Sequence, residues 1–145
     1  MSIEPTNAWA LSCRGSVYYW LEQCDNALND LNKSLEIEPD HDDGWSHKVR
    51  GDVYCKLNQY DNALNDYKKS LDLNPTNAPA LSRRGFAYYK LKQYGNALND
   101  LDVSLEFEPY DAWTLGIRGE IYRVLKKYDN VLDYFTVYVQ IMHGN

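Results

Sequence analysis

The sequence predicts an all-α, right-handed superhelical solenoid of four antiparallel helix hairpins, and three observations lead to this fold class. The dipeptide Arg-Gly returns four times, with steps of 36, 34 and 34 residues. A tyrosine follows each glycine by three residues, and an alanine follows each of the first three glycines by twelve. The first three units each close on Ser-Leu and a proline. A fixed period in this range indicates supersecondary units that stack into one array.

The apolar pattern inside each unit predicts two helices joined by a short bridge. In the third unit, Leu81, Gly85 and Tyr88 fall at helical spacing, and a second stripe starts at Tyr94. Gly85 and Ala97 are small where two antiparallel helices have to approach closely. The expected A helices are 8–21, 44–57, 78–91 and 112–125, and the expected B helices are 24–37, 60–73, 94–107 and 128–141.

Local signals place the repeat boundaries. A proline ends each of the first three B helices, and Asn77 caps the next A helix with Pro79 in its first turn. The longer first step comes from a two-residue insertion, Asp42-Asp43. The repeats are expected at 8–43, 44–77, 78–111 and 112–145. Residues 1–7 repeat the tail of a unit, so we interpret them as the remnant of a preceding repeat and the chain as a piece of a longer array.

Composition excludes several classes of function. The net charge of −6 argues against a nucleic-acid binder, and 44% hydrophobic residues suffice for a folded domain. No apolar run approaches the roughly 20 residues of a membrane span, and Cys13, Cys24 and Cys55 lack metal-type spacing. We therefore expect a cytoplasmic protein with reduced thiols, no cofactor, no nucleic-acid partner and no membrane association.

Catalysis and metal binding find little support in the sequence. The histidines His41, His47 and His143 lie in or near expected connections or at the chain end, so we expect solvent-exposed or capping roles for them. Repeated pairs such as Asp25-Asn26 open the B helices, where they complement the helix N-terminus. No nucleophile beside a base and no clustered ligands appear. The sequence predicts a protein that is not an enzyme.

These recurring residues resemble the tetratricopeptide repeat, whose unit has 34 residues with Gly, Tyr, Leu, Tyr, Ala, Ser or Ala and Pro at fixed positions. Two departures are an arginine before each glycine, and Val131 and His143 in place of the last alanine and proline. A Sel1-like relative would need a longer loop between the helices. The resemblance implies a non-catalytic scaffold for protein-protein interaction whose A helices line a concave groove.

The groove is predicted from A-helix residues that turn away from helix B. Its aromatic and basic character suggests that it binds a protein or peptide, with an acidic-apolar segment as the first partner to test. The alternative is that the tryptophans pack against the preceding connections. The predicted peptide-binding residues are Trp9, Tyr19, Trp20, Trp45, Lys48, Lys56, Arg83, Phe86, Tyr89, Lys90, Trp113 and Arg123.

The family's best-known site is a two-carboxylate clamp for the acidic C-terminal tails of heat-shock chaperones. Its Lys, Asn and Arg positions, laid on the first three repeats, hold Ser12, Ser16, Val49, Pro79 and Arg83, of which Arg83 alone fits. Moved one repeat on, the positions retain a fit at Lys48 alone. The sequence therefore disfavours a chaperone-tail adaptor.

Two further expectations concern charge and the chain end. The arginine before each glycine needs an acceptor, and we expect pairing across repeats, for example Asp30 with Arg50 and Asp66 with Arg84; pairing within a repeat is the alternative. The last B helix is unusually apolar, so an alternative function is structural self-assembly, with homodimers formed through Leu132, Phe135 and Val139.

Overall fold

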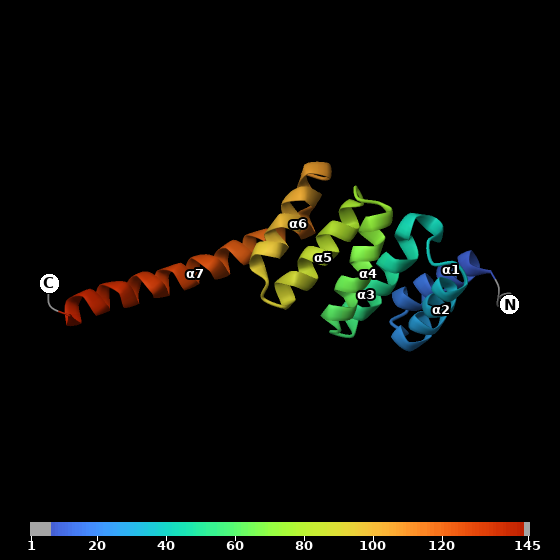
Figure 1. The fold of residues 1–145 in the computed structure, drawn as a ribbon, viewed down its shortest axis with the longest axis horizontal. Coiled ribbons are helices and arrows are strands. Elements are labelled where there is room, and N and C mark those ends of the chain that lie inside the picture. Colours follow the sequence, from blue (N-terminus) through green and yellow to red (C-terminus); the bar gives the residue numbers. More distant parts are fainter. Residues whose placement is uncertain (1–6, 144–145) are drawn as a thin grey trace.

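The computed structural model describes residues 7–143, and these form an all-α stack of helix hairpins followed by one long helix (Figure 1). Neighbouring helices pack in chain order, so the array is elongated. The all-α solenoid class predicted from the sequence is confirmed. The helices are α1 Ala8–Trp20, α2 Cys24–Ile37, α3 Trp45–Lys56, α4 Tyr60–Leu73, α5 Ala78–Lys90, α6 Tyr94–Phe107 and α7 Ala112–Met142.

The first six helices begin and end within one residue of the predicted bounds because their end signals are local. Asn7 and Asn77 cap α1 and α5 by accepting hydrogen bonds from the main-chain N–H groups of Ala10 and Ala80, at 2.9 Å and 3.2 Å. The expected remnant of an earlier repeat falls on residues 1–6, outside the described residues, apart from Asn7.

Each of the first three hairpins is held by a glycine facing a large buried side chain. A Cβ added to Gly15 or Gly85 would lie 2.9 Å from Leu31 or Leu101, and one added to Gly51 would lie 2.7 Å from Tyr67. The small residue therefore sets how closely helix A and helix B approach. The alanines at the next contact are fully buried, as predicted from their spacing.

A bidentate ion pair also joins the two helices of each hairpin, which corrects one prediction. Arg14 binds Asp30, Arg50 binds Asp66 and Arg84 binds Asp100, with nitrogen-to-oxygen distances of 2.6–2.8 Å. The pairs lie within repeats, so the expected pairing across repeats is wrong. Residues 16 apart face each other across one hairpin, whereas the aspartates of the preceding repeat point into their own hairpin.

The insertion Asp42-Asp43 forms a 3₁₀ turn, His41–Gly44, that leads into α3. Both aspartates have a positive φ, 58° and 51°, and Gly44 follows with φ 86°. Gly44 is buried against the main chain of Ser70, where a Cβ would lie 2.8 Å from the Ser70 carbonyl oxygen. The insertion is thus accommodated by a left-handed turn that only glycine can finish at this distance.

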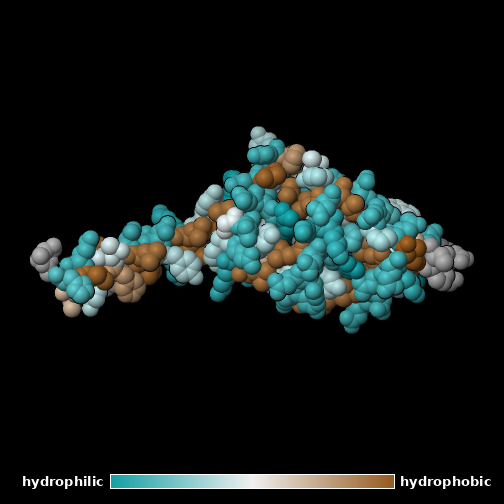
Figure 2. All heavy atoms as spheres, viewed as in Figure 1, coloured by the Kyte–Doolittle hydropathy of each residue, from teal (hydrophilic) through white to brown (hydrophobic). Residues whose placement is uncertain are grey.

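The fourth repeat does not form the predicted hairpin. Segments 112–125 and 128–141 join into the single 31-residue helix α7, which leaves the stack and extends away from it (Figure 1). Apolar side chains lie along this extension (Figure 2). None of the described helices combines the length and hydropathy of a membrane span.

The connecting residues explain why α7 continues. In the first three repeats the bridge contains a residue with positive φ, and a glutamine whose Oε1 accepts a hydrogen bond from the asparagine three residues later. Lys127 replaces that glutamine, and an ammonium cannot accept from Asn130. Leu125-Lys126 repeats Leu91-Lys92 of the third repeat, so Lys127, a good helix former, is the change in the bridge that favours a continuous helix.

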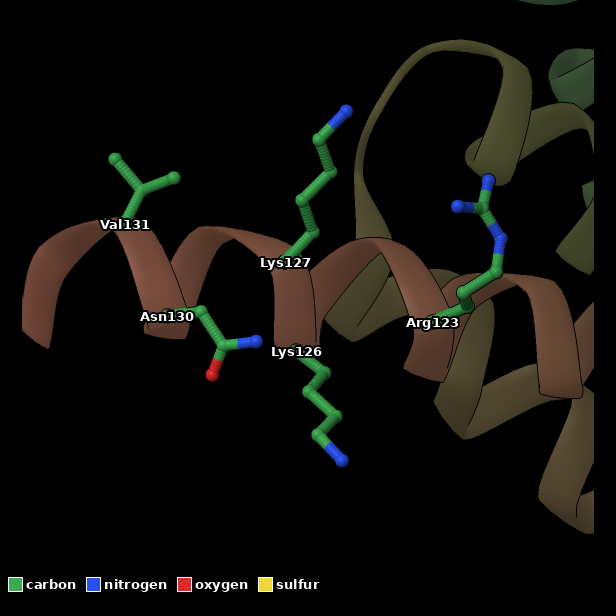
Figure 3. A pocket seen from close by; sticks show the side chains of 5 residues that line it. All are labelled: Arg123, Lys126, Lys127, Asn130 and Val131. Atoms are coloured by element: carbon green, nitrogen blue, oxygen red, sulfur yellow. The ribbon is translucent and has the colours of Figure 1, made fainter. Parts of the chain in front are cut away.

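The replacement of the buried alanine by Val131 also disfavours a hairpin in the fourth repeat. Val131 stands where the first three repeats have a fully buried alanine, and its extra volume does not fit that close contact. A hollow of about 470 Å³ remains at this point, lined by Arg123, Lys126, Lys127, Asn130 and Val131 (Figure 3).

Candidate functional site

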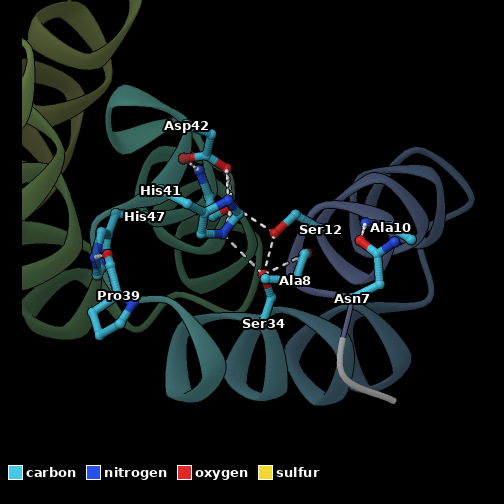
Figure 4. A network of polar contacts seen from close by, with 10 residues as sticks. Asn7, Ala8, Ala10, Ser12, Ser34, Pro39, His41, Asp42 and His47 are labelled. Carbon is cyan, nitrogen blue, oxygen red and sulfur yellow. Dashed lines mark hydrogen bonds and ion pairs between the residues drawn. The ribbon is translucent and has the colours of Figure 1, made fainter. Parts of the chain in front are cut away.

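A serine, a histidine and an aspartate meet near the 3₁₀ turn, in an order that resembles a catalytic triad (Figure 4). Ser34 Oγ lies 3.0 Å from His41 Nε2, and His41 Nδ1 lies 3.2 Å from Asp42 Oδ2. However, Ser34 is fully buried, donates to the Ala8 carbonyl at 2.7 Å and lies 2.6 Å from Ser12 Oγ. The hydroxyl is thus occupied and closed to a substrate, and the network ties α1 and α2 to the connection.

The role expected for His47 is wrong. This residue lies in the first turn of α3, inside the predicted A helix 44–57, but it is buried and not exposed to solvent. Its Nε2 donates to the Pro39 carbonyl at 3.0 Å, and its Nδ1 lies 3.4 Å from Asp66 Oδ1. His47 therefore joins the core to the repeat boundary. Within residues 7–143, no cluster of three His, Cys, Asp or Glu side chains has the arrangement of a metal site.

The predicted groove residues lie on the A-helix surface, formed by α1, α3, α5 and the first half of α7, which contact one another in that order. Their aromatic rings form two groups. Trp9 and Trp45 lie together, with ring centroids 5.7 Å apart. Phe86 lies 5.5 Å from Trp113 and 6.4 Å from Tyr89. One aromatic group therefore belongs to the first two repeats and the other to the last two.

Three cations lie over these rings. Lys56 Nζ is 4.3 Å from the centre of the Tyr19 ring, and the Arg83 guanidinium is 4.4 Å from the Trp113 ring. Lys90 Nζ lies 5.5 Å from the Phe86 ring. No ion pair joins these three cations to a carboxylate among residues 7–143. They present positive charge beside apolar rings, which is the chemistry that receives carboxylates flanked by apolar side chains.

The other two predicted cations are neutralised. Lys48 Nζ lies 2.8 Å from Asp52 Oδ2, and Asp52 also accepts a hydrogen bond from the Tyr67 hydroxyl at 2.6 Å. Arg123 forms a two-pronged pair with Glu120 one turn earlier in α7. Positive charge on the A-helix surface is therefore concentrated on Lys56, Arg83 and Lys90.

The aromatic predictions divide by burial. Trp9 and Trp20 are exposed, whereas Tyr19 is buried and Trp45 packs partly against the core between α1 and α3. Sequence reasoning missed Tyr60, whose ring lies 6.4 Å from Phe86, and Tyr94, 6.2 Å from Tyr89. Both open B helices. A tyrosine at that position in consecutive repeats was the available signal.

Cys55 lies beside this surface and is expected to react slowly. Burial raises the pKa of its thiol to about 11, although the Tyr67 hydroxyl 3.5 Å away acts in the opposite direction. Because the thiolate is the nucleophile, alkylation of Cys55 at pH 8 should be about a hundredfold slower in the folded protein than in urea. Peptide mass spectrometry after timed iodoacetamide treatment measures this ratio; equal rates would contradict the burial argument.

Part of the chain matches a known protein family. Residues 51–92 match the family model described as TPR repeat. Over these residues the chain carries the tetratricopeptide repeat (TPR). The match runs from Gly51 in the second A helix to Lys92, just after the third, and includes one complete Arg-Gly dipeptide, Arg84-Gly85. None of the curated proteins searched matches the chain.

Solved TPR domains have the same fold. The first TPR domain of human RPAP3 is 25% identical, with a TM-score of 0.79 over 88% of this chain and 98% of that one. The first TPR of Spaghetti (RPAP3), solved with the HSP90 peptide SRMEEVD, is 24% identical, with a TM-score of 0.79 over 86% and 97%. The Sgt2 TPR domain from Aspergillus fumigatus is 18% identical, with a TM-score of 0.77 over 85% and 82%.

Proposed function

We propose that this protein is a non-catalytic interaction scaffold that binds an acidic-apolar segment of a partner protein on the A-helix surface. The observation that carries the proposal is the set of three cations, Lys56, Arg83 and Lys90, each held over an aromatic ring without a carboxylate partner in the described part of the chain. Aromatic rings provide apolar contact area, while the cations select carboxylates.

The solved TPR structures support a peptide as the partner class. The peptide in the Spaghetti structure, SRMEEVD, combines three acidic side chains with methionine and valine. In the present chain, one of the family's clamp positions in the first three repeats keeps a matching residue, Arg83. We therefore assign peptide recognition here to the ring-and-cation surface, which does not require a free C-terminal carboxylate.

Charge reversal tests the surface directly. We expect Lys56→Glu, Arg83→Glu and Lys90→Glu together to weaken binding of a fluorescein-labelled SRMEEVD peptide at least about tenfold at 0.1 M salt, measured by anisotropy. The matched control reverses Lys33, Lys68 and Lys69, which lie exposed on α2 and α4. Equal losses in both triple variants would show a long-range charge effect and would remove this site.

Amidation of the peptide separates the two modes of recognition. A two-carboxylate clamp loses one of its two anchors when the C-terminal carboxylate is amidated, whereas the ring-and-cation surface retains the side-chain carboxylates. We expect amidated and free peptides to bind within about threefold of each other. A much larger loss on amidation would assign the site to a clamp instead.

The aromatic contribution has its own test. Phe86→Ala is expected to lower peptide affinity by about tenfold or more with nearly unchanged helical content, because rings at the centre of a binding surface are typical hot spots. Tyr110→Ala is the matched control, since Tyr110 is exposed in the connection before α7. If Phe86→Ala unfolds the protein, the ring belongs to the core and the aromatic part of the proposal fails.

A further inference from the structure

The first half of α7 has one packed face and one bare face. Ile121 is fully buried against the preceding hairpin, as are Val53 and Ala87 at the same repeat position. On the other face, an added Cβ at Gly119 would meet nothing within 4 Å, although the equivalent glycines of the first three repeats touch a buried side chain. Leu115 is 38% exposed. At its position the first and third repeats have leucines that are 3% and 6% exposed. A helix B is missing from this face.

The second half of α7 lacks the other member of the hairpin. Its residues correspond to a helix B, but they have no helix A beside them. Val131 is 44% exposed where the other repeats bury an alanine completely, and Val139 is 51% exposed where they have leucines at 7–8%. The large apolar residues described as exposed on this half are Tyr128, Val131, Leu132, Phe135, Val137, Tyr138, Val139, Ile141 and Met142. Isolated exposed apolar residues are normal on protein surfaces, but a group of this size on one helix marks an interaction site.

We propose that a second copy of this chain supplies the missing helix, so that two copies exchange residues 128–142 in a domain-swapped dimer. The internal repeat identifies the occupant. In each closed hairpin the residue 16 positions after the glycine fills the glycine contact: Leu31, Tyr67 and Leu101. Phe135 holds that position in the fourth repeat. The bare face of one copy is therefore built for the second half of α7 of the other.

The length and register of α7 fit a two-fold arrangement. Gly119 and Phe135 each lie eight residues from Lys127, and the helix ends Ala112 and Met142 each lie fifteen residues from it. Two antiparallel copies of α7 that cross at Lys127 would therefore bring Gly119 of each copy opposite Phe135 of the other. The two helices would then overlap over their whole length, about 46 Å at 1.5 Å per residue. The same register brings Lys126 of one copy close to Asp129 of the other, which offsets the repulsion between lysines at the crossing.

A continuous α7 favours exchange over closure within one chain. The tight bend of the first three repeats includes a glutamine that accepts a hydrogen bond from an asparagine and is followed by a fully buried alanine, and the fourth repeat has Lys127 and Val131 at these two positions. Two separate helices are free to cross at a wider spacing than a hairpin with a three-residue bridge. Val131 then fits between them, at the hollow in Figure 3.

Gly119→Leu tests the proposal without weakening the helix. Leucine is a better helix former than glycine, and its Cβ would meet nothing within 4 Å in the single chain, but in the exchanged dimer the side chain would clash with the partner's residue 135. We expect light scattering over micromolar concentrations to show a dimer for the wild type, and dimerisation at least about tenfold weaker for Gly119→Leu. Gly95→Leu is the matched control because an added Cβ at Gly95 also meets nothing, and Gly95 lies in α6 away from α7's bare face.

Cysteine cross-linking identifies the chain that provides the helix. Leu115 and Val139 are each twelve residues from Lys127, so Leu115→Cys in one copy should form a disulfide with Val139→Cys in another when the two variants are mixed. Mixtures of the wild type with either single variant measure the disulfides that Cys13, Cys24 and Cys55 form with the introduced cysteine, and these serve as the background. A cross-link that appears only when both cysteines are in one chain, a strictly monomeric wild type, or oligomers that Gly119→Leu leaves intact would each overturn the exchange.

Head-to-tail stacking makes a different prediction. The exposed Val17 at the other end of the array could receive the second half of α7 from another copy. That contact does not close on itself, so masses above the dimer that fall on Val17→Glu would also overturn the exchange.

Discussion

Replacing Asp66 by alanine is expected to lower the free energy of unfolding by about 3 kcal/mol, because it leaves a largely buried guanidinium without its partner. Asp66 accepts two hydrogen bonds from Arg50, at 2.7 Å and 2.8 Å, and the two side chains are 3% and 17% exposed. In the variant, Arg50 can still donate a hydrogen bond to Asn32, so we expect a loss at the lower end of the range for broken buried ion pairs. Urea denaturation followed by circular dichroism measures the difference.

The same pair sets a pH dependence. Burial acts to raise the pKa of Asp66, but the hydrogen bonds from Arg50 and His47 outweigh it and hold the pKa below its ordinary value. A carboxyl group with a depressed folded pKa stabilises the fold above its unfolded pKa, and this stabilisation is lost as pH falls through the folded value. The wild type should therefore lose its advantage over Asp66→Ala below about pH 4.

Asp102→Ala provides the matched control for the buried pair. Asp102 binds Arg118 at 3.1 Å, but its side chain is half exposed, so its removal should cost less than about 1 kcal/mol. If Asp66→Ala and Asp102→Ala had equal effects, burial would not determine the strength of these pairs.

Gly44→Ala is expected to destabilise the protein by about 2 to 4 kcal/mol, combining backbone strain with a steric clash. Gly44 has φ 86°, and the new Cβ would lie 2.8 Å from a main-chain oxygen of α4 and 2.9 Å from the Cα of Ser70. Backbone atoms of a packed helix cannot rotate out of the way as a flexible side chain can. Thermal and urea unfolding of the variant measure the loss.

Gly95→Ala should have the opposite effect. Gly95 lies in the first turn of α6, where an added Cβ meets nothing within 4 Å, so alanine should stabilise the protein by up to about 1 kcal/mol. A small effect of Gly44→Ala, comparable with that of Gly95→Ala, would mean that the 3₁₀ turn relaxes easily and that the insertion is not tightly fitted.

Sequence by itself determined the helices of the first three repeats and the contacts between them. Their caps, bridges and prolines act within a few residues, so α1 to α6 fall where the pattern places them. The glycine and alanine of each repeat likewise predicted the close crossing of helix A and helix B, because only small residues permit it. On the A-helix surface, the period identified which side chains share a face, including Phe86 and Trp113.

Tertiary structure decided the rest, because these features depend on distances that spacing does not encode. Arg50 has aspartates 16 residues after it and 20 before it, and the hairpin geometry selects the later one. Packing likewise neutralises Lys48, buries His47 and brings Tyr60 to Phe86. The fourth repeat shows the limit most clearly: its Arg-Gly and tyrosine match the pattern, yet changes at the bridge and at Val131 remove the local support for a bend, and α7 continues as one helix.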